Sequence, residues 1–346
     1  MKIFNNIKEW QKTNKPFVAY KKPNSTIIQS YFQNDDGVNT SDNFEESGFI
    51  FAPFDSNESS IIFSNNNSIY LEESFKHSDF EFDATPLYFN TNESSKQEHL
   101  ELVSDGIKAI KKGDFKKVVL SRKETIDLSE INIIEIFQRL IYLYSTAMVY
   151  VWHHPKIGTW MGATPETLLQ VNNDNFSTMS LAGTQLYKGT VDVDWKSKEI
   201  EEQQFVTDYI LEKLLPHTTK IISSELRTIK AGNLLHLQTK IEGIHKGNIK
   251  KLINSLHPTP AVCGLPKEIS KDFITKNENY HRKFYTGFLG ELNVNKTTNL
   301  FVNLRCMEIH KNSANLFIGG GITIDSIPEK EWQETVSKTS TMKKVL

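Results

Sequence analysis

The sequence predicts an α+β fold whose sheets are mostly antiparallel. Short apolar stretches bounded by turn residues follow one another in runs, and they do not alternate strictly with helices as a parallel βαβ fold requires. Segments with helical spacing of apolar residues lie between these runs and near the end of the chain. The composition, with 38% hydrophobic and 24% charged residues, is that of an ordinary folded protein.

The length of 346 residues is compatible with two domains or with one large unit made of two halves. The formal net charge of −2 provides no general positive field that would attract nucleic acid. The lysines between residues 108 and 123 are interleaved with apolar and acidic residues and form no basic stripe. We therefore expect no nucleic-acid partner.

The chain shows no pattern typical of secretion or membrane insertion. Its first residues lack the apolar core of a signal peptide, and no stretch approaches the ~20 apolar residues of a membrane span. Cys263 and Cys306 stand alone in apolar stretches, so we expect buried thiols and no disulfide. These features predict a soluble, cytoplasmic protein with no membrane partner.

Residues 1–96 are predicted to be scaffold, because short strands and polar loops alternate there and few acids, bases or metal ligands come together. The predicted strands are 17–20, 27–28 and 48–51, and the predicted loops are 34–46 and 55–60.

The character of the chain changes from about residue 97. Helical spacing over 98–112 ends at Gly113, a common helix stop, and the charged segment 195–215 predicts a second long helix. The other predicted helices are 134–144, 249–256 and one from about 329, and the predicted strands are 118–120, 147–152, 160–161, 168–171, 176–181, 284–292 and 300–308.

Two short segments hold a candidate base and a candidate acid. Lys117 begins an apolar strand, where a lysine is usually a solvated strand end, but burial would favour the neutral form that accepts a proton. Glu166 ends the turn-like sequence GATPE, where a glutamate commonly caps a helix. Together, at facing strand ends, the two side chains would suit a general base and a general acid.

Acidic residues gather on two predicted helices. The segment 199–206, EIEEQQFV, is most simply a solvated surface, although an inward carboxylate could bind a hard cation. In the last helix Glu331, Glu334 and Lys338 share one face, and the last two are spaced as an i, i+4 surface pair. Neither segment decides a function by itself.

Two further segments are built from glycine and proline. Gly319, Gly320 and Gly321 would let backbone N–H groups approach an anion, but GGGI lacks the GxGxxG spacing of a dinucleotide site. In HPTPAVCG, residues 257–264, two prolines fix an extended loop. A lone histidine such as His257 in such a loop is more often structural than catalytic.

Taken together and in this order, these segments resemble the chorismate-utilising enzymes, a family that includes isochorismate, salicylate, anthranilate and aminodeoxychorismate synthases. The resemblance covers residues 97–342 and rests on an ordered set of motifs. The motifs are KVVLSR (117–122), GATPE (162–166), LAGT (181–184), KEIEEQQFV (198–206), LLHL (234–237), HPTPAVCG (257–264), NLRC (303–306), GGGI (319–322) and EWQETVSK (331–338).

The resemblance implies a role for each matching residue. Lys117 would be the base that activates water, and Glu166 the acid that protonates the departing 4-hydroxyl of chorismate. Glu202 and Glu334 would hold Mg²⁺, with Glu199 or Glu201 as alternatives to Glu202, because relatives often place histidine where this helix reads EEQQ. The residues that match substrate-binding positions are His257, Ala261, Arg305, Gly319, Gly320, Gly321 and Lys338.

The resemblance also indicates the nucleophile. Members that use ammonia resemble one another in carrying threonine where Ala261 stands, and they commonly lack Lys117. The pattern therefore implies Mg²⁺-dependent conversion of chorismate to isochorismate. Salicylate synthesis and an aminated product stay open as alternatives. So does non-catalytic chorismate binding, although the intact set of Lys117, Glu166, Glu202 and Glu334 argues against it.

The fold that the resemblance implies is a single domain of two similar halves, with large, mostly antiparallel sheets around a central cleft and helices outside. Residues 1–96 would form an N-terminal scaffold, and residues 97–346 the chorismate-binding catalytic region. A monomer whose product enters menaquinone biosynthesis is the further expectation, and siderophore biosynthesis stays open as the alternative pathway.

Overall fold

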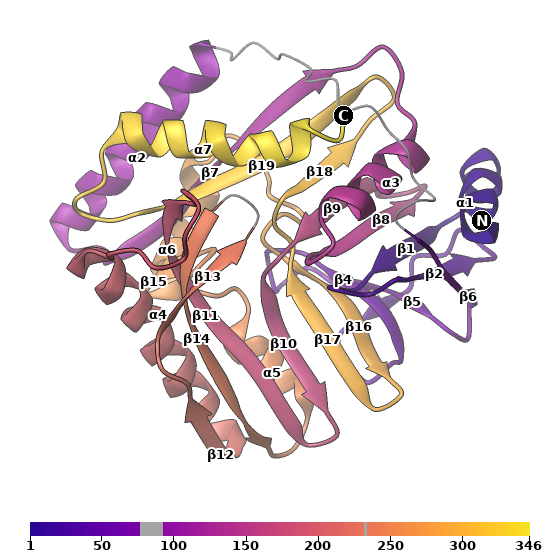
Figure 1. The fold of residues 1–346 in the computed structure, drawn as a ribbon, viewed down its shortest axis with the longest axis horizontal. Coiled ribbons are helices and arrows are strands. Elements are labelled where there is room, and N and C mark those ends of the chain that lie inside the picture. The colour runs from indigo at the N-terminus through magenta and orange to yellow at the C-terminus, as the bar shows by residue number, and fades with distance from the viewer. Residues whose placement is uncertain (77–92, 232–233) are drawn as a thin grey trace.

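Two large antiparallel sheets pack against each other in the computed structural model, which describes residues 1–76, 93–231 and 234–346 (Figure 1). The nine-stranded sheet contains β1 (Phe17–Lys21), β2 (Ile27–Gln33), β6 (Ser68–Ser74), β7 (Lys117–Asp127), β8 (Met148–His154), β9 (Gly158–Thr164), β15 (Gly264–Leu265), β18 (Cys306–Ile309) and β19 (Ser313–Ile322). Its spatial order is β15-β7-β19-β18-β9-β8-β1-β2-β6.

The ten-stranded sheet contains β3 (Thr40–Ser41), β4 (Gly48–Ala52), β5 (Ser60–Ser64), β10 (Thr167–Asn172), β11 (Asn175–Leu186), β12 (Thr218–Ser223), β13 (Arg227–Ala231), β14 (Leu234–His245), β16 (Phe288–Val294) and β17 (Thr297–Val302). Its order is β12-β14-β11-β10-β17-β16-β4-β5-β3, and β13 also pairs with β14. Both sheets therefore combine strands from before and after residue 97.

Helices cover the outer faces of the sheets (Figure 1). The helices are α1 (Lys2–Lys12), α2 (Glu93–Lys112), α3 (Ile133–Leu143), α4 (Ser197–Leu214), α5 (Ile249–Leu256), α6 (Lys267–Asn277) and α7 (Pro328–Lys343), with a 3₁₀ turn at Leu215–His217. Helices α1 and α3 pack on the nine-stranded sheet, and α4 and α5 pack on the ten-stranded sheet. None of the helices in the described residues is long and apolar enough to cross a membrane.

An aromatic layer joins the two sheets. Phe51 of β4 lies 5.0 Å from Trp152 of β8, centroid to centroid, and Phe63 of β5 meets the same indole edge-on at 5.9 Å. Phe51 also stacks on Phe284 at 4.2 Å. Buried aromatic contacts of this kind hold the sheets in one relative position, which fixes the strand ends that carry polar side chains.

The predicted α+β class with mostly antiparallel sheets is confirmed, but two predicted strands are wrong in extent. The segment 300–308 is not one strand, since β17 ends at Val302 and β18 begins at Cys306 in the other sheet. Arg305 between them has a left-handed backbone, with φ of 47°, which breaks the extended run. The segment 284–292 becomes a strand only at Phe288, because Thr286, with φ of 60°, lies in a turn before it.

The N-terminal region also contains elements that were not predicted from its polar composition. Helix α1 places Ile3, Phe4 and Ile7 on one buried face, and burial of such side chains is worth about 1.5–3 kcal/mol each. The predicted loop 34–46 contains the two-residue strand β3, and the predicted loop 55–60 ends where β5 begins. The proposed division at residue 96 stays a prediction.

Candidate active site

A cavity of about 220 Å³ lies between β7, β19, the connection from β17 to β18, and the helices α4 and α7. Of the eleven residues predicted for the site, all of them in the described part of the chain, ten line this cavity. They are Lys117, Glu166, Glu202, Ala261, Arg305, Gly319, Gly320, Gly321, Glu334 and Lys338. Residues scattered over more than 220 positions of sequence are thus brought to one place.

His257 is the predicted site residue that lies outside the cavity lining. Its ring is buried edge-on against Phe288, with centroids 5.0 Å apart, and its Nε2–H donates to the carbonyl oxygen of Pro53 at 3.0 Å. Burial lowers the pKa of His257 to about 4, so the ring is neutral. This histidine packs the 257–264 loop against the ten-stranded sheet.

The candidate base, Lys117, is buried at the start of β7. Its Nζ contacts Oε1 of Glu202 on α4 at 2.6 Å, and the lysine side chain is 7% exposed against 20% for the glutamate. The residue is therefore not a solvated strand end. An amine accepts a proton only in its neutral form. The ion pair with Glu202 must therefore break, and Lys117 must lose its proton, before it can act as a base.

The candidate acid, Glu166, lies in the short connection between β9 and β10, after Pro165, and no helix follows it. Backbone and hydroxyl bonds hold this connection, because Val302 N–H donates to the Glu166 carbonyl oxygen and Thr164 Oγ1 donates to the Val302 carbonyl oxygen. Burial raises the pKa of the Glu166 carboxyl to about 7, even though the charges of Arg305 and Lys117 favour the ionised form. A carboxyl that is partly protonated near neutral pH suits a general acid.

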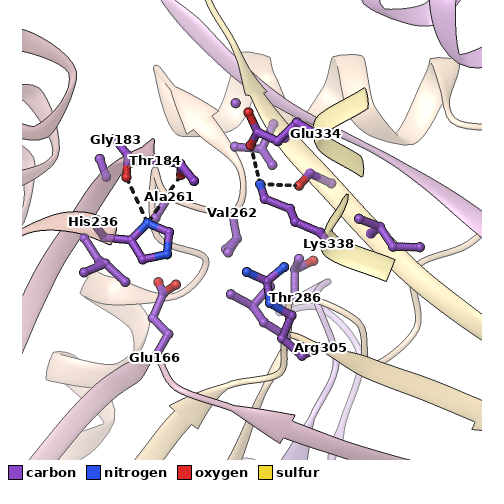
Figure 2. A pocket seen from close by; sticks show the side chains of 18 of the residues that line it. Glu166, Gly183, Thr184, His236, Ala261, Val262, Thr286, Arg305, Glu334 and Lys338 are labelled. Atoms are coloured by element: carbon purple, nitrogen blue, oxygen red, sulfur yellow. Dashed lines mark hydrogen bonds and ion pairs between the residues drawn. The ribbon is translucent and has the colours of Figure 1, made fainter. Parts of the chain in front are cut away.

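Glu334 and Lys338 on α7 form an ion pair inside the cavity and not on the outer surface (Figure 2). Lys338 Nζ lies 2.6 Å from Oε1 of Glu334 and donates to the Gly319 carbonyl oxygen at 3.1 Å. The Lys338 ammonium holds the pKa of Glu334 below its usual value. Arg305 lies on the same side of the cavity and Glu166 on the opposite side.

His236 on β14 is a lining residue that was not predicted for the site, although it belongs to the LLHL motif. Its Nδ1–H donates to the Gly183 carbonyl oxygen at 2.9 Å, which leaves Nε2 as an acceptor. Burial lowers the pKa of His236 to about 4, so the ring is neutral at pH 7. In Figure 2 this ring lies on the side of Glu166. Other lining residues outside the predicted set include Thr184, Glu199, Tyr285, Thr286 and Glu331.

The three glycines lie within strand β19 and line the cavity. A Cβ at Gly320 would lie 3.6 Å from Oε2 of Glu331 and 3.9 Å from Oε1 of Glu334. A Cβ at Gly321 would lie 3.4 Å from Oε1 of Glu202. Carboxylates from both helices therefore come within contact distance of two adjacent residues of one strand.

These carboxylates supply a donor set that fits a hard divalent cation. Helices α4 and α7 each contribute two glutamates three residues apart, Glu199 with Glu202 and Glu331 with Glu334. Oε2 of Glu199 is buried and has no hydrogen-bond partner among the described residues. No three acidic, histidine or cysteine side chains of the described ranges converge closely enough to form a ready metal site. Glu202 and Glu334 each form an ion pair with a lysine. Both of these ion pairs would have to break before a cation could bind the two glutamates.

Comparison with known proteins places this cavity in context. Residues 55–346 match the family described as chorismate binding enzyme. The isochorismate synthase EntC of Escherichia coli (strain K12) is 31% identical over 242 residues, which cover 65% of this chain and 61% of that protein. The salicylate biosynthesis isochorismate synthase of Pseudomonas aeruginosa is 29% identical over 255 residues, 70% of this chain and 53% of that protein. The chain thus spans between about half and three-fifths of the length of these relatives.

Solved structures share the fold over nearly the whole chain. The DhbC protein of Bacillus anthracis has a TM-score of 0.81 at 24% identity and covers 98% of this chain and 99% of its own. MenF, the menaquinone-specific isochorismate synthase of Escherichia coli, has a TM-score of 0.78 at 20% identity and covers 96% of this chain and 88% of its own. Since the family match covers well over half of the sequence, the protein belongs to the chorismate binding enzymes.

Proposed function

We propose that this protein is an isochorismate synthase that adds water to chorismate and releases isochorismate. The observation that carries the proposal is the cavity itself, where Lys117 and Glu166 meet two cationic groups, Arg305 and Lys338, and a set of carboxylates. Chorismate is a dianion, so it requires cations for binding and a separate base and acid for an exchange of hydroxyl groups.

In the proposed reaction neutral Lys117 takes a proton from a water molecule as the water oxygen bonds to C2 of chorismate. The ring double bond shifts, the C4–O bond breaks, and Glu166 gives its proton to the departing hydroxyl group. One water enters and one water leaves, so the net change is an isomerisation. Arg305 and Lys338 would bind the substrate carboxylates, and the space beside Gly319, Gly320 and Gly321 would admit the ring.

We infer that Glu202 and Glu334 would hold Mg²⁺, with Glu199 and Glu331 beside them. When bound, Mg²⁺ would supply positive charge that offsets the repulsion between these carboxylates and a dianionic substrate. Glu201, the alternative ligand on the same helix, is exposed and does not line the cavity among the described residues.

The choice of ligands is tested by Mg²⁺ titration calorimetry without substrate. Glu202→Gln and Glu334→Gln are expected to weaken Mg²⁺ binding at least tenfold, because each removes a negative oxygen ligand. Glu201→Gln is the matched control on the same helix and is expected to bind like the wild type. Equal binding by all four proteins would remove Glu202 and Glu334 from the metal site.

Turnover in Mg²⁺ and in EDTA separates an enzyme from a non-catalytic chorismate-binding protein. We expect isochorismate to form with Mg²⁺ and turnover to stop in EDTA. Saturable chorismate binding without turnover in either condition would contradict the proposal. Release of salicylate and pyruvate would indicate a salicylate synthase instead.

The proposal extends to the setting of the enzyme, a cytoplasmic monomer whose product enters menaquinone biosynthesis. Sedimentation at micromolar concentration tests the monomer. Growth rescue tests the pathway in two bacterial strains, one lacking its menaquinone-specific isochorismate synthase and one lacking its siderophore-specific enzyme. Rescue of the siderophore-deficient strain alone would reverse the assignment.

A further inference from the structure

Strand β7, which carries Lys117, loses its strand neighbour on one edge after two residues. The short strand β15 pairs only with Lys117 and Val118. Beyond it, Val119 N–H still donates to the Cys263 carbonyl oxygen at 2.8 Å. The next groups on this edge bond to side chains, since the Val119 carbonyl oxygen accepts from Arg282 and Ser121 N–H donates to Glu278. Two side chains thus take the place of a further strand.

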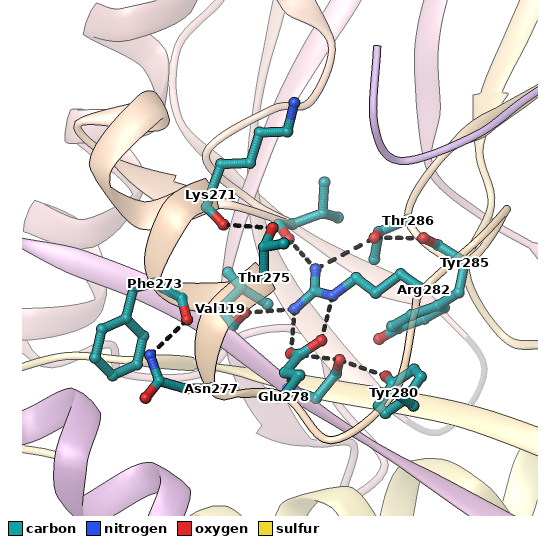
Figure 3. Close-up of polar contacts among 12 residues, drawn as sticks. Val119, Lys271, Phe273, Thr275, Asn277, Glu278, Tyr280, Arg282, Tyr285 and Thr286 are labelled. Carbon is teal, nitrogen blue, oxygen red and sulfur yellow. Dashed lines mark hydrogen bonds and ion pairs between the residues drawn. The ribbon is translucent and has the colours of Figure 1, made fainter. Parts of the chain in front are cut away.

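Arg282 uses every donor of its guanidinium in this network (Figure 3). Nε donates to Oε2 of Glu278 at 2.7 Å, and Nη2 donates to Oε1 of Glu278 at 2.5 Å and to the Val119 carbonyl oxygen at 2.8 Å. Nη1 donates to the Val262 carbonyl oxygen at 3.0 Å and to Thr286 Oγ1 at 3.3 Å. The side chain is buried, and its charge is paired with Glu278, which is also buried.

The acceptors of Arg282 belong to three separate parts of the cavity wall. Val119 lies two residues after Lys117, Val262 follows Ala261, and Thr286 lines the cavity itself. Arg282 does not line the cavity. It therefore acts on the site only through the segments that it joins.

We propose that Arg282, held by Glu278, is a positioning residue that fixes the strand of Lys117 against the Ala261–Val262 loop and Thr286. This proposal rests on the proposed function, in which Lys117 must stand at a set distance from substrate held between these walls. A displacement of about 1 Å between a catalytic group and its substrate can cost about 100-fold in rate.

Arg282→Lys separates positioning from charge pairing. Lysine keeps the positive charge beside Glu278 but has three donors on one atom, so it cannot reach both backbone carbonyls and Thr286 at once. We expect kcat to fall by about 10- to 100-fold, with KM for chorismate changed less than threefold, because Arg305 and Lys338 are untouched. Mg²⁺ binding measured by calorimetry should also remain unchanged.

Two further variants complete the experiment. Arg139→Lys also removes arginine bonds to backbone carbonyls, those of Val345 and Leu346, but at the C-terminus, away from the cavity, and should leave kcat unchanged. Ser121→Ala removes the hydroxyl that bonds Glu278 and Tyr280 and leaves Arg282 in place, so it is the milder variant if Arg282→Lys does not fold, with a 2- to 5-fold loss of kcat expected.

The outcomes are distinct. A lowered melting temperature with unchanged kcat in folded Arg282→Lys, or in Ser121→Ala if that variant must stand in for it, would overturn the positioning role and leave the proposed function intact. An absence of chorismate turnover by the wild type would overturn both.

Discussion

Replacing Lys117 with alanine is expected to reduce kcat for isochorismate formation by about 10²- to 10⁴-fold, the usual contribution of a general base. The lysine is buried against the cavity and its Nζ is held 2.6 Å from Glu202, so alanine at this position removes the amine that the proposed reaction uses as its base. Chorismate turnover with saturating Mg²⁺ measures the effect.

Lys116 provides the matched control. It precedes Lys117 in sequence, but it is exposed, and its Nζ lies over the ring of Phe205 outside the cavity. Lys116→Ala is expected to turn over chorismate at the wild-type rate. If Lys117→Ala kept more than a third of the wild-type kcat, the base would have to be another group.

Replacing Glu166 with glutamine is expected to lower kcat by a similar factor, about 10²- to 10⁴-fold, because an amide cannot give a proton to the departing hydroxyl group. The shape of the side chain is retained, so chorismate binding by calorimetry should change little. Wild-type kcat/KM should also fall as pH rises above about 7, where the Glu166 carboxyl of the free enzyme loses its proton. Retention of wild-type kcat by Glu166→Gln would exclude this residue as the acid.

The same substitution should stabilise the fold at high pH. The pKa of Glu166 rises from an ordinary 4.5 to about 7 on folding, so between these values the folded protein holds a proton that the unfolded chain releases. The contribution of Glu166 to stability is therefore full below pH 4.5 and is lost as pH rises through 7. In thermal unfolding, the melting temperature of Glu166→Gln minus that of the wild type should increase from pH 5 to pH 8. A constant difference would show that the carboxyl is not buried as the structure has it.

The sequence was enough to predict a set of residues that the fold brings together, because each of them stands in a short motif. Lys117, Glu166, Arg305 and Lys338 each stand in a distinct local pattern, and all four line one cavity. His257, in contrast, lies outside the cavity lining, and its motif does not reveal that Pro53, about 200 positions earlier, supplies the carbonyl that its ring bonds.

The parts that escaped prediction depend on contacts between distant segments. Arg305 interrupts an apolar run that reads as one strand, and only the two sheets on either side of it explain its left-handed backbone. His236 lies on β14, a strand that was not among the predicted ones, and its place in the cavity depends on how β14 pairs with β11. The ion pair between Lys117 and Glu202, 85 positions apart, has no local signal, although Glu202 itself stands in a motif.

The most direct test of the account is chromatographic analysis of the products after purified protein is incubated with chorismate and Mg²⁺. The account predicts an equilibrium mixture of chorismate and isochorismate that forms with the wild type and not with Lys117→Ala. If folded wild-type protein left chorismate unchanged, with or without ammonia, this result would contradict the proposed function.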